Sequence, residues 1–127
     1  MSSPGSFRGL RTAIYAVADL TAAKAWYTSV LERPPYFDEE FYVGFNVGGF
    51  ELGLVPEADA PAERDAAGVA FWGVENAEVA YARLVTLGGI DHEPVQDVGG
   101  GVKIGAVRDP FGNVLGVVEN PHFTVEK

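Results

Sequence analysis

The stretch LRTAIYAVADLTAAKAWYTSVLE, residues 10–32, decides the fold, because its order of elements recurs later in the chain. In residues 10–18, β-branched and aromatic side chains alternate with other residues, which predicts a strand. Asp19 then stands before an apolar pattern of helical spacing and is a preferred N-cap, so a helix is predicted over 20–32. The two prolines at 34–35 end that helix, because proline lacks the backbone donor that a helix needs.

The second half of the chain repeats this order. Residues 68–74 predict a strand, Asn76 an N-cap, and residues 77–89 a helix closed by glycines. Three strands are expected after each helix, the third of the first set following a Gly-Gly turn. These strands are predicted at 36–39, 41–47 and 50–55 in the first half, and at about 90–96, 102–108 and 113–118 in the second.

The repeat can be checked by alignment. Residues 17–20 (VADL) align with 74–77 (VENA) at an offset of 57, and residues 52–55 (LGLV) align with 115–118 (LGVV) at an offset of 63. The six additional residues belong to loops of the second half. An internal repeat fixes the architecture, and here it gives two copies of a βαβββ module.

We therefore predict an α+β fold, in which two βαβββ repeats form an eight-stranded, partly open, barrel-like curved sheet with the helices outside. The whole chain is expected to form one compact domain. Its predicted parts are a flexible N-terminal tail, the first module, a linker, the second module and a C-terminal tail, at 1–8, 9–55, 56–67, 68–123 and 124–127.

Composition excludes several classes of function. The net charge is −9 and only 9 basic residues are present, scattered along the chain, which argues against nucleic acids and anionic membrane surfaces as partners. The chain has no cysteine, which excludes disulfides, thiolate catalysis and Cys-based zinc sites. No apolar run approaches the roughly 20 residues that span a bilayer, and the N-terminus lacks a signal-peptide pattern, so a cytoplasmic location is expected.

Alternation along the strands predicts which residues share a face. On each strand, the alternate residues with the larger side chains should face the helices. The alternate residues that include a glycine would then line the concave side of the sheet. Gly53 and Gly116 occupy repeat-equivalent strand positions. Glycine within a strand marks close approach by a ligand or another backbone, or relieves crowding where a sheet bends, and the sequence leaves both interpretations open.

Five segments carry a resemblance to a known family: 17–20, the Trp-Tyr pair at 26–27, 74–76, DPFGN at 109–113 and VENPHF at 118–123. Through them, residues from about 9 to 123 resemble the vicinal oxygen chelate superfamily, which includes glyoxalase I, bleomycin resistance proteins and extradiol dioxygenases. The resemblance implies the fold and a homodimer. It does not fix an activity, because one fold hosts many functions.

Metal-dependent members of that superfamily place ligands at four points: a His before the first helix, its repeat equivalent, and a carboxylate or Gln in the fourth and eighth strands. The resemblance puts these points at Thr12, Val69, Gly53 and Gly116. Thr12 is a poor ligand and the other three have no coordinating side chain, whereas a catalytic metal needs about three His or carboxylate ligands. We therefore expect neither a metal nor another cofactor.

Two titratable residues are candidates for acid–base chemistry. Glu51 should share the face of Gly53, where a partly buried carboxylate has a raised pKa and can act as a base or pair with a cationic ligand. His92, within Asp-His-Glu at 91–93, is the second candidate. The alternatives are a solvated Glu at the rim and an exposed His at a loop edge.

Aromatic side chains in a concave face bind flat or apolar small molecules. The predicted ligand-binding residues are Thr12, Ile14, Phe41, Tyr42, Phe45, Glu51, Gly53, Val69, Phe71 and Gly116.

The sequence thus predicts a metal-free glyoxalase/bleomycin-resistance-like protein that binds a small aromatic or cationic molecule in the concave face. The alternative is a lyase or isomerase of the same superfamily, with a displaced metal or with Glu51 and His92 as acid and base. A third option is a regulatory or assembly domain without a ligand. The identity of the ligand, and whether the protein is an enzyme at all, stay open.

Overall fold

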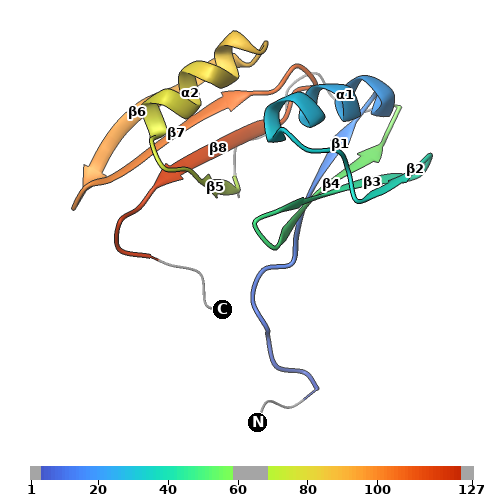
Figure 1. Ribbon diagram of the computed structural model, residues 1–127, viewed down its shortest axis with the longest axis horizontal. Coiled ribbons are helices and arrows are strands. Elements are labelled where there is room, and N and C mark those ends of the chain that lie inside the picture. Colours follow the sequence, from blue (N-terminus) through green and yellow to red (C-terminus); the bar gives the residue numbers. More distant parts are fainter. Residues whose placement is uncertain (1–3, 59–68, 124–127) are drawn as a thin grey trace.

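A computed structural model describes residues 4–58 and 69–123 (Figure 1). It confirms the α+β prediction of two βαβββ modules. Most of the predicted linker and the C-terminal tail lie outside the described residues. The elements, in chain order, are β1 (Thr12–Val17), α1 (Leu20–Leu31), β2 (Phe37–Glu39), β3 (Tyr42–Val47), β4 (Phe50–Pro56), β5 (Phe71–Gly73), α2 (Ala77–Thr86), β6 (Ile90–Gly99), β7 (Val102–Arg108) and β8 (Val114–Glu119).

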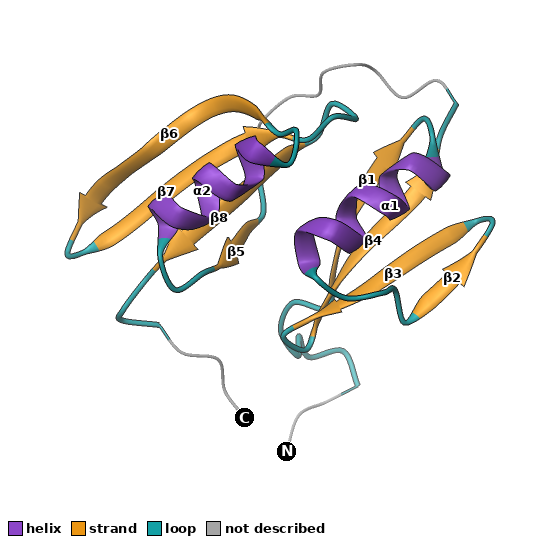
Figure 2. Cartoon of the chain, turned by 45° about the horizontal axis from the view of Figure 1, so that its top comes forward, coloured by secondary structure: helices purple, strands orange, loops and turns teal. Residues whose placement is uncertain are grey.

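Each module forms its own four-stranded sheet. The strand order is β1-β4-β3-β2 in the first and β5-β8-β7-β6 in the second, so the repeat extends to the topology. β1 runs parallel to β4 and β5 parallel to β8, whereas the other pairs are antiparallel. The eight predicted strands are therefore divided between two sheets that form no closed barrel, and each sheet carries one helix across one face (Figure 2).

Both helices begin at the predicted caps. The side chains of Asp19 and Asn76 each accept a backbone N–H from three residues further on, at 3.0 Å. α2 ends at Thr86, before the predicted end at residue 89, because Gly88 has a φ of +113° that breaks the helix. Neither helix of the described residues is long and apolar enough to cross a membrane.

The core lies between the helices and the sheets. α1 packs on β3 and β4, and α2 packs on β6, β7 and β8. The bulky strand sets face this layer, as predicted, and their buried members are Tyr15, Val17, Leu52, Leu54, Leu115 and Val117. These side chains come from both modules and form one cluster, so the two modules share a core.

Asp109 joins the two modules by a buried polar contact. Its carboxylate is 1% exposed and accepts a hydrogen bond from the Tyr27 hydroxyl of α1 at 2.6 Å. The other carboxylate oxygen accepts the backbone N–H groups of Phe111 and Asn113, both at 2.9 Å, which shapes the predicted DPFGN turn. Burial raises the pKa of Asp109, and these hydrogen bonds only partly oppose that effect.

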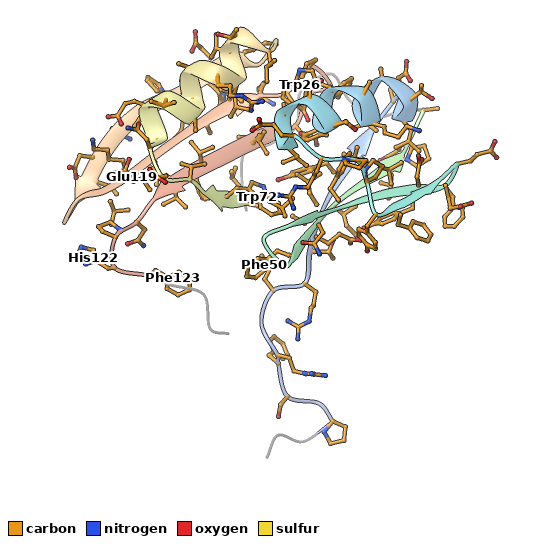
Figure 3. The ribbon with its side chains drawn as sticks, in the orientation of Figure 1. Trp26, Phe50, Trp72, Glu119, His122 and Phe123 are labelled. Carbon is orange, nitrogen blue, oxygen red and sulfur yellow. The ribbon has the colours of Figure 1, made fainter. Side chains whose placement is uncertain are left out.

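Two tryptophans add further contacts across the junction (Figure 3). Trp26 of α1 donates its indole N–H to the carbonyl of Leu87, which follows α2, at 2.8 Å. Trp72 of β5 donates to the hydroxyl of Tyr15 in β1 at 3.1 Å. These contacts hold the modules side by side with both helices on the same side of the molecule (Figures 1 and 2).

Gly116 allows β8 to approach β5 closely. Its N–H donates to the carbonyl of Ala70 at 3.2 Å, and the ring of Phe71 lies against it. A Cβ at this position would lie 2.8 Å from the Ala70 oxygen and 2.6 Å from Phe71 Cδ1. Of the interpretations that the sequence left open, close approach of the neighbouring backbone and ring accounts for this glycine.

We expect the substitution Tyr27→Phe to destabilise the protein by about 1–3 kcal/mol, because a buried Asp109 oxygen then loses its donor. The matched control is Tyr81→Phe, which removes an exposed hydroxyl bonded to Asp91 and should change stability by less than about 0.5 kcal/mol. Urea unfolding monitored by fluorescence measures both. Equal effects of the two substitutions would contradict the role of Asp109 at the junction.

We expect Gly116→Ala to destabilise the protein by about 1–3 kcal/mol, because the methyl group meets a backbone carbonyl that cannot move without disturbing β5. Gly73→Ala is the control within β5, since a Cβ there meets nothing within 4 Å. Thermal unfolding of the two variants should separate them clearly. A Gly116→Ala variant as stable as Gly73→Ala would show that the contact is not a constraint.

Candidate functional site

The face of the two sheets opposite the helices is the predicted concave face, and we call it the helix-free face. Both helices lie on one side of the molecule, so neither helix covers this face (Figures 1 and 2). Two apolar side chains on it are substantially exposed: Ile14 of β1 at 54% and Phe71 of β5 at 43%. Exposed apolar groups on a sheet face are candidates for contact with a ligand or a partner.

Glu51 is the central polar residue of this face. In β4 it pairs with Thr12 of β1 on one side and Asn46 of β3 on the other. One carboxylate oxygen accepts a short hydrogen bond from the Tyr36 hydroxyl, and the other accepts one from the Tyr42 hydroxyl at 2.5 Å. We call the side chains of Thr12, Tyr36, Tyr42 and Glu51 the Glu51 cluster.

The cluster changes the acidity of its members. Burial raises the pKa of the Glu51 carboxyl, but the hydroxyls of Thr12, Tyr36 and Tyr42 together outweigh it, so the pKa lies below its ordinary value. The expectation of a raised pKa was wrong, because it considered burial without these donors. Conversely, the pKa of Tyr36 is raised, mainly by its bond to Glu51, and that of Tyr42 is raised by burial and then by the same carboxylate.

Thr12 takes part without a regular hydrogen bond. Its Oγ1 is buried and has no partner at hydrogen-bonding geometry among the described residues. It nevertheless lies near enough to the carboxylate of Glu51 to help lower its pKa. Its other neighbour in the cluster is Tyr42, whose pKa it also lowers, so this covered hydroxyl belongs to the interior of the cluster.

Two glycines leave the space that the cluster occupies. A Cβ at Gly44 would lie 2.6 Å from a carboxylate oxygen of Glu51 and 3.1 Å from the Tyr36 ring. A Cβ at Gly53 would collide with the Tyr42 hydroxyl and lie 2.7 Å from the ring carbon that carries it. The positions of Glu51 and Tyr42 therefore depend on the absence of side chains at 44 and 53.

Aromatic rings continue from the cluster toward the turn between β2 and β3. The ring centroid of Phe37 lies 6.4 Å from that of Tyr36, 6.1 Å from that of Tyr42 and 6.0 Å from that of Phe41. Spacings in this range are typical of interacting aromatic pairs. Phe41 lies in the turn and is exposed, so it sits at the edge of this aromatic group and not within the sheet.

The structure brings most of the predicted site residues together by module. Thr12, Ile14, Tyr42, Glu51 and Gly53 lie on the helix-free face of the first sheet, where Ile14 pairs with Gly53. In the second sheet, Phe71 of β5 pairs with Gly116 of β8, and Val69 precedes β5.

Phe45 is a correction. It is 0% exposed and belongs to the core cluster, so it does not lie on the helix-free face. The reason is the alternation along β3: Tyr42 and Gly44 face Glu51, which turns Val43 and Phe45 toward the helices. The sidedness of β3 could not be read from its sequence, because large apolar residues occur on both faces.

His92 and Glu51 are not brought together. His92 lies in β6, the outer strand of the second sheet, whereas Glu51 lies in β4 of the first. The residue that sequence reasoning missed is Tyr36, which stands just before β2 and reaches Glu51 across β3. An aromatic-rich segment at 36–45 was the available signal, but it did not indicate which rings would face the carboxylate.

The four points at which metal-dependent relatives carry ligands do not fit a metal here. Gly53 and Gly116 lie against the rings of Tyr42 and Phe71, which fill the space that ligand side chains would need. Val69 has no coordinating atom, and Thr12 alone supplies one hydroxyl. Within residues 4–58 and 69–123, no group of three or more His, Asp or Glu side chains is placed to hold a metal ion.

A shallow hollow of about 420 Å³ lies elsewhere, between α1 and the segment from β2 to β3. Lys24 and Asp38 line it and form an ion pair at 3.1 Å. None of the predicted site residues lines this hollow. Its widely open shape and its paired charges make it a weaker candidate than the Glu51 cluster.

Comparison with known proteins identifies the fold. A glyoxalase-related enzyme from Fulvimarina pelagi is 18% identical, with a TM-score of 0.76 and coverage of 94% of each chain. A lactoylglutathione lyase from Agrobacterium tumefaciens is 22% identical, with a TM-score of 0.70 and coverage of 98% of this chain and 100% of the other. The fosfomycin resistance protein FosX from Listeria monocytogenes is 16% identical, with a TM-score of 0.73 and coverage of 92% and 97%.

A search of curated proteins found no match to the sequence. The family model described as Glyoxalase/Bleomycin resistance protein/Dioxygenase superfamily matches residues 9–117. This range includes the first module with the Glu51 cluster, and the second module as far as Val117 in β8. The chain therefore belongs to the glyoxalase/bleomycin resistance protein/dioxygenase superfamily.

Proposed function

We propose that the protein binds a small aromatic or cationic molecule on its helix-free face and does so without a metal. The observation that carries this proposal is the Glu51 cluster, a partly buried carboxylate held by two phenol hydroxyls on the face that also exposes Ile14 and Phe71. Binding sites for small molecules commonly combine apolar and aromatic surface with a few placed polar groups.

The metal-free part of the proposal rests on the two glycines. At each repeat-equivalent position an aromatic ring occupies the space of the ligand side chain that metal-dependent relatives carry. Restoring a carboxylate at 53 would displace Tyr42, and restoring one at 116 would press on the Ala70 carbonyl. Aromatic rings therefore fill the space at the equivalent position of both modules.

We propose further that the protein acts as a homodimer in the cytoplasm. The exposed apolar side chains of the helix-free face, Ile14 and Phe71, favour a partner surface near the ligand. The absence of cysteine fits a protein that gains nothing from an oxidising compartment.

The enzymatic alternative is a lyase or isomerase that uses Glu51 as its base. Glu51 is well placed to contact a ligand, but its lowered pKa makes it a weak base, and His92 lies in the other module. Binding without turnover is the function that this geometry supports best.

We expect a thermal-shift screen of aromatic amines, alcohols and acids to identify ligands of the protein. A compound present at ten times its Kd should stabilise the native state by about 1.4 kcal/mol, which raises the melting temperature by several degrees. Amide chemical-shift changes should then gather at Thr12, Ile14, Gly53 and Phe71. Shifts confined to the hollow beside Lys24 and Asp38, or no binder at all, would contradict the proposed site.

We expect the purified, untagged protein to contain Zn, Ni, Fe and Mn at well below one ion per chain by mass spectrometry. Added Zn²⁺ or Ni²⁺ should leave the melting temperature unchanged, because no described group of side chains can hold the ion. Treatment with a chelator should leave ligand binding unchanged as well. A stoichiometric metal together with loss of binding on chelation would overturn the metal-free proposal.

A further inference from the structure

The charge of Glu51 has hydrogen bonds but no counter-charge from the described residues. The ion pairs there include Lys24–Asp38, Arg83–Glu32 and Lys103–Glu78, and none of these involves Glu51. Arg33 donates to the carbonyl of Asn46, the β3 residue paired with Glu51, at 2.8 Å. Arg11 precedes Thr12 in the chain, and its carbonyl accepts the Glu51 N–H at 2.8 Å. Its guanidinium turns away, however, and donates to the carbonyl of Arg8 at 2.7 Å.

Neutral donors leave this negative charge in place. The phenols of Tyr36 and Tyr42 each donate one hydrogen bond to the carboxylate, but they bring no positive charge. A carboxylate that is partly removed from water gains most from an opposite charge at contact distance. Anionic groups of a ligand are therefore disfavoured at this position, and cationic groups are favoured.

An inorganic cation does not match the available donors. Ca²⁺ and Mg²⁺ require six or more oxygen ligands, several of them charged, and Glu51 is the only carboxylate of the cluster. The rings of Tyr36 and Tyr42, with Phe37 beyond them, instead offer aromatic faces to an organic cation.

The carboxylate narrows the choice of cation further. Each Glu51 oxygen accepts one tyrosine hydrogen bond and keeps a lone pair for a second donor. A protonated amine has N–H donors for this carboxylate, whereas a quaternary ammonium has none. Ile14, exposed in β1 and paired with Gly53, offers apolar surface to the body of the ligand.

We propose that the Glu51 cluster is a subsite for a protonated amine carried by an apolar or aromatic ligand, an assignment that rests on the proposed binding function. The ammonium group donates hydrogen bonds to Glu51 and lies against the tyrosine rings. The organic body of the ligand extends along the sheet over Ile14.

Three probes of similar shape and different charge test this subsite: benzylamine, benzyl alcohol and benzoate. Titration at neutral pH, followed by amide chemical shifts, gives a Kd for each probe with the wild-type protein. We expect benzylamine to bind about tenfold more tightly than benzyl alcohol, since a charge-assisted hydrogen bond replaces a neutral one, and benzoate to bind least. This comparison uses the wild-type protein alone and does not depend on the folding of any variant.

The variant Glu51→Gln removes the charge and keeps the shape. We expect it to abolish the preference for benzylamine over benzyl alcohol while leaving the affinity for benzyl alcohol unchanged. The control Glu93→Gln in β6 removes one negative charge in the other module and should retain the preference. This pair of variants separates a local subsite from the general attraction of an acidic protein.

The failure of the subsite and the failure of the proposed function are distinguishable. Equal affinity for benzylamine and benzyl alcohol, with shifts on the helix-free face, overturns the subsite and leaves the binding function intact. Loss of the preference in Glu93→Gln as well as Glu51→Gln also overturns it, because the effect is then one of net charge. No shift on the helix-free face with any probe overturns both.

Discussion

One helix covers one face of each four-stranded sheet, and that face supplies most of the core. Strand residues alternate between the faces, and the bulky sets are drawn to the side of the helix, where they join a single core. The other face carries the glycines, the Glu51 cluster and the exposed side chains of Ile14 and Phe71. The helix side of each sheet therefore serves the core, and the helix-free face carries the groups that can contact a ligand.

The second constraint acts at Gly53 and Gly116, where one volume cannot hold two side chains. In this chain the volume belongs to the rings of Tyr42 and Phe71, and these rings exclude ligand-bearing side chains at the same positions. The consequence is chemical as well as steric. The resemblance puts a metal-binding carboxylate of metal-dependent members at the position of Gly53. In this chain the carboxylate is instead that of Glu51, two residues earlier, and its neighbours are neutral hydroxyls.

Much of the fold could be predicted from the sequence because its signals are local. The strand–cap–helix order, the capping residues Asp19 and Asn76 and the DPFGN turn depend on near neighbours, and the structure has all of them. The alternation of β1 and β4 likewise identified the face of Glu51.

The site was harder to predict because it depends on contacts between strands. β3 carries large apolar residues at successive positions, so alternation could not place Phe45, which proved to be core. The pKa of Glu51 depends on Tyr36 and Tyr42, and which hydroxyls reach it follows from the register of β3 on β4 and of β2 on β3. The register of these strand pairs could not be predicted from the sequence.

The most direct measurement is a crystal structure of the protein grown with benzylamine. The expected result is an ammonium nitrogen about 3 Å from a Glu51 oxygen and beside the Tyr36 and Tyr42 rings, with no metal ion on the helix-free face. Benzylamine bound elsewhere, or a metal ion coordinated on that face, would contradict the metal-free cation site.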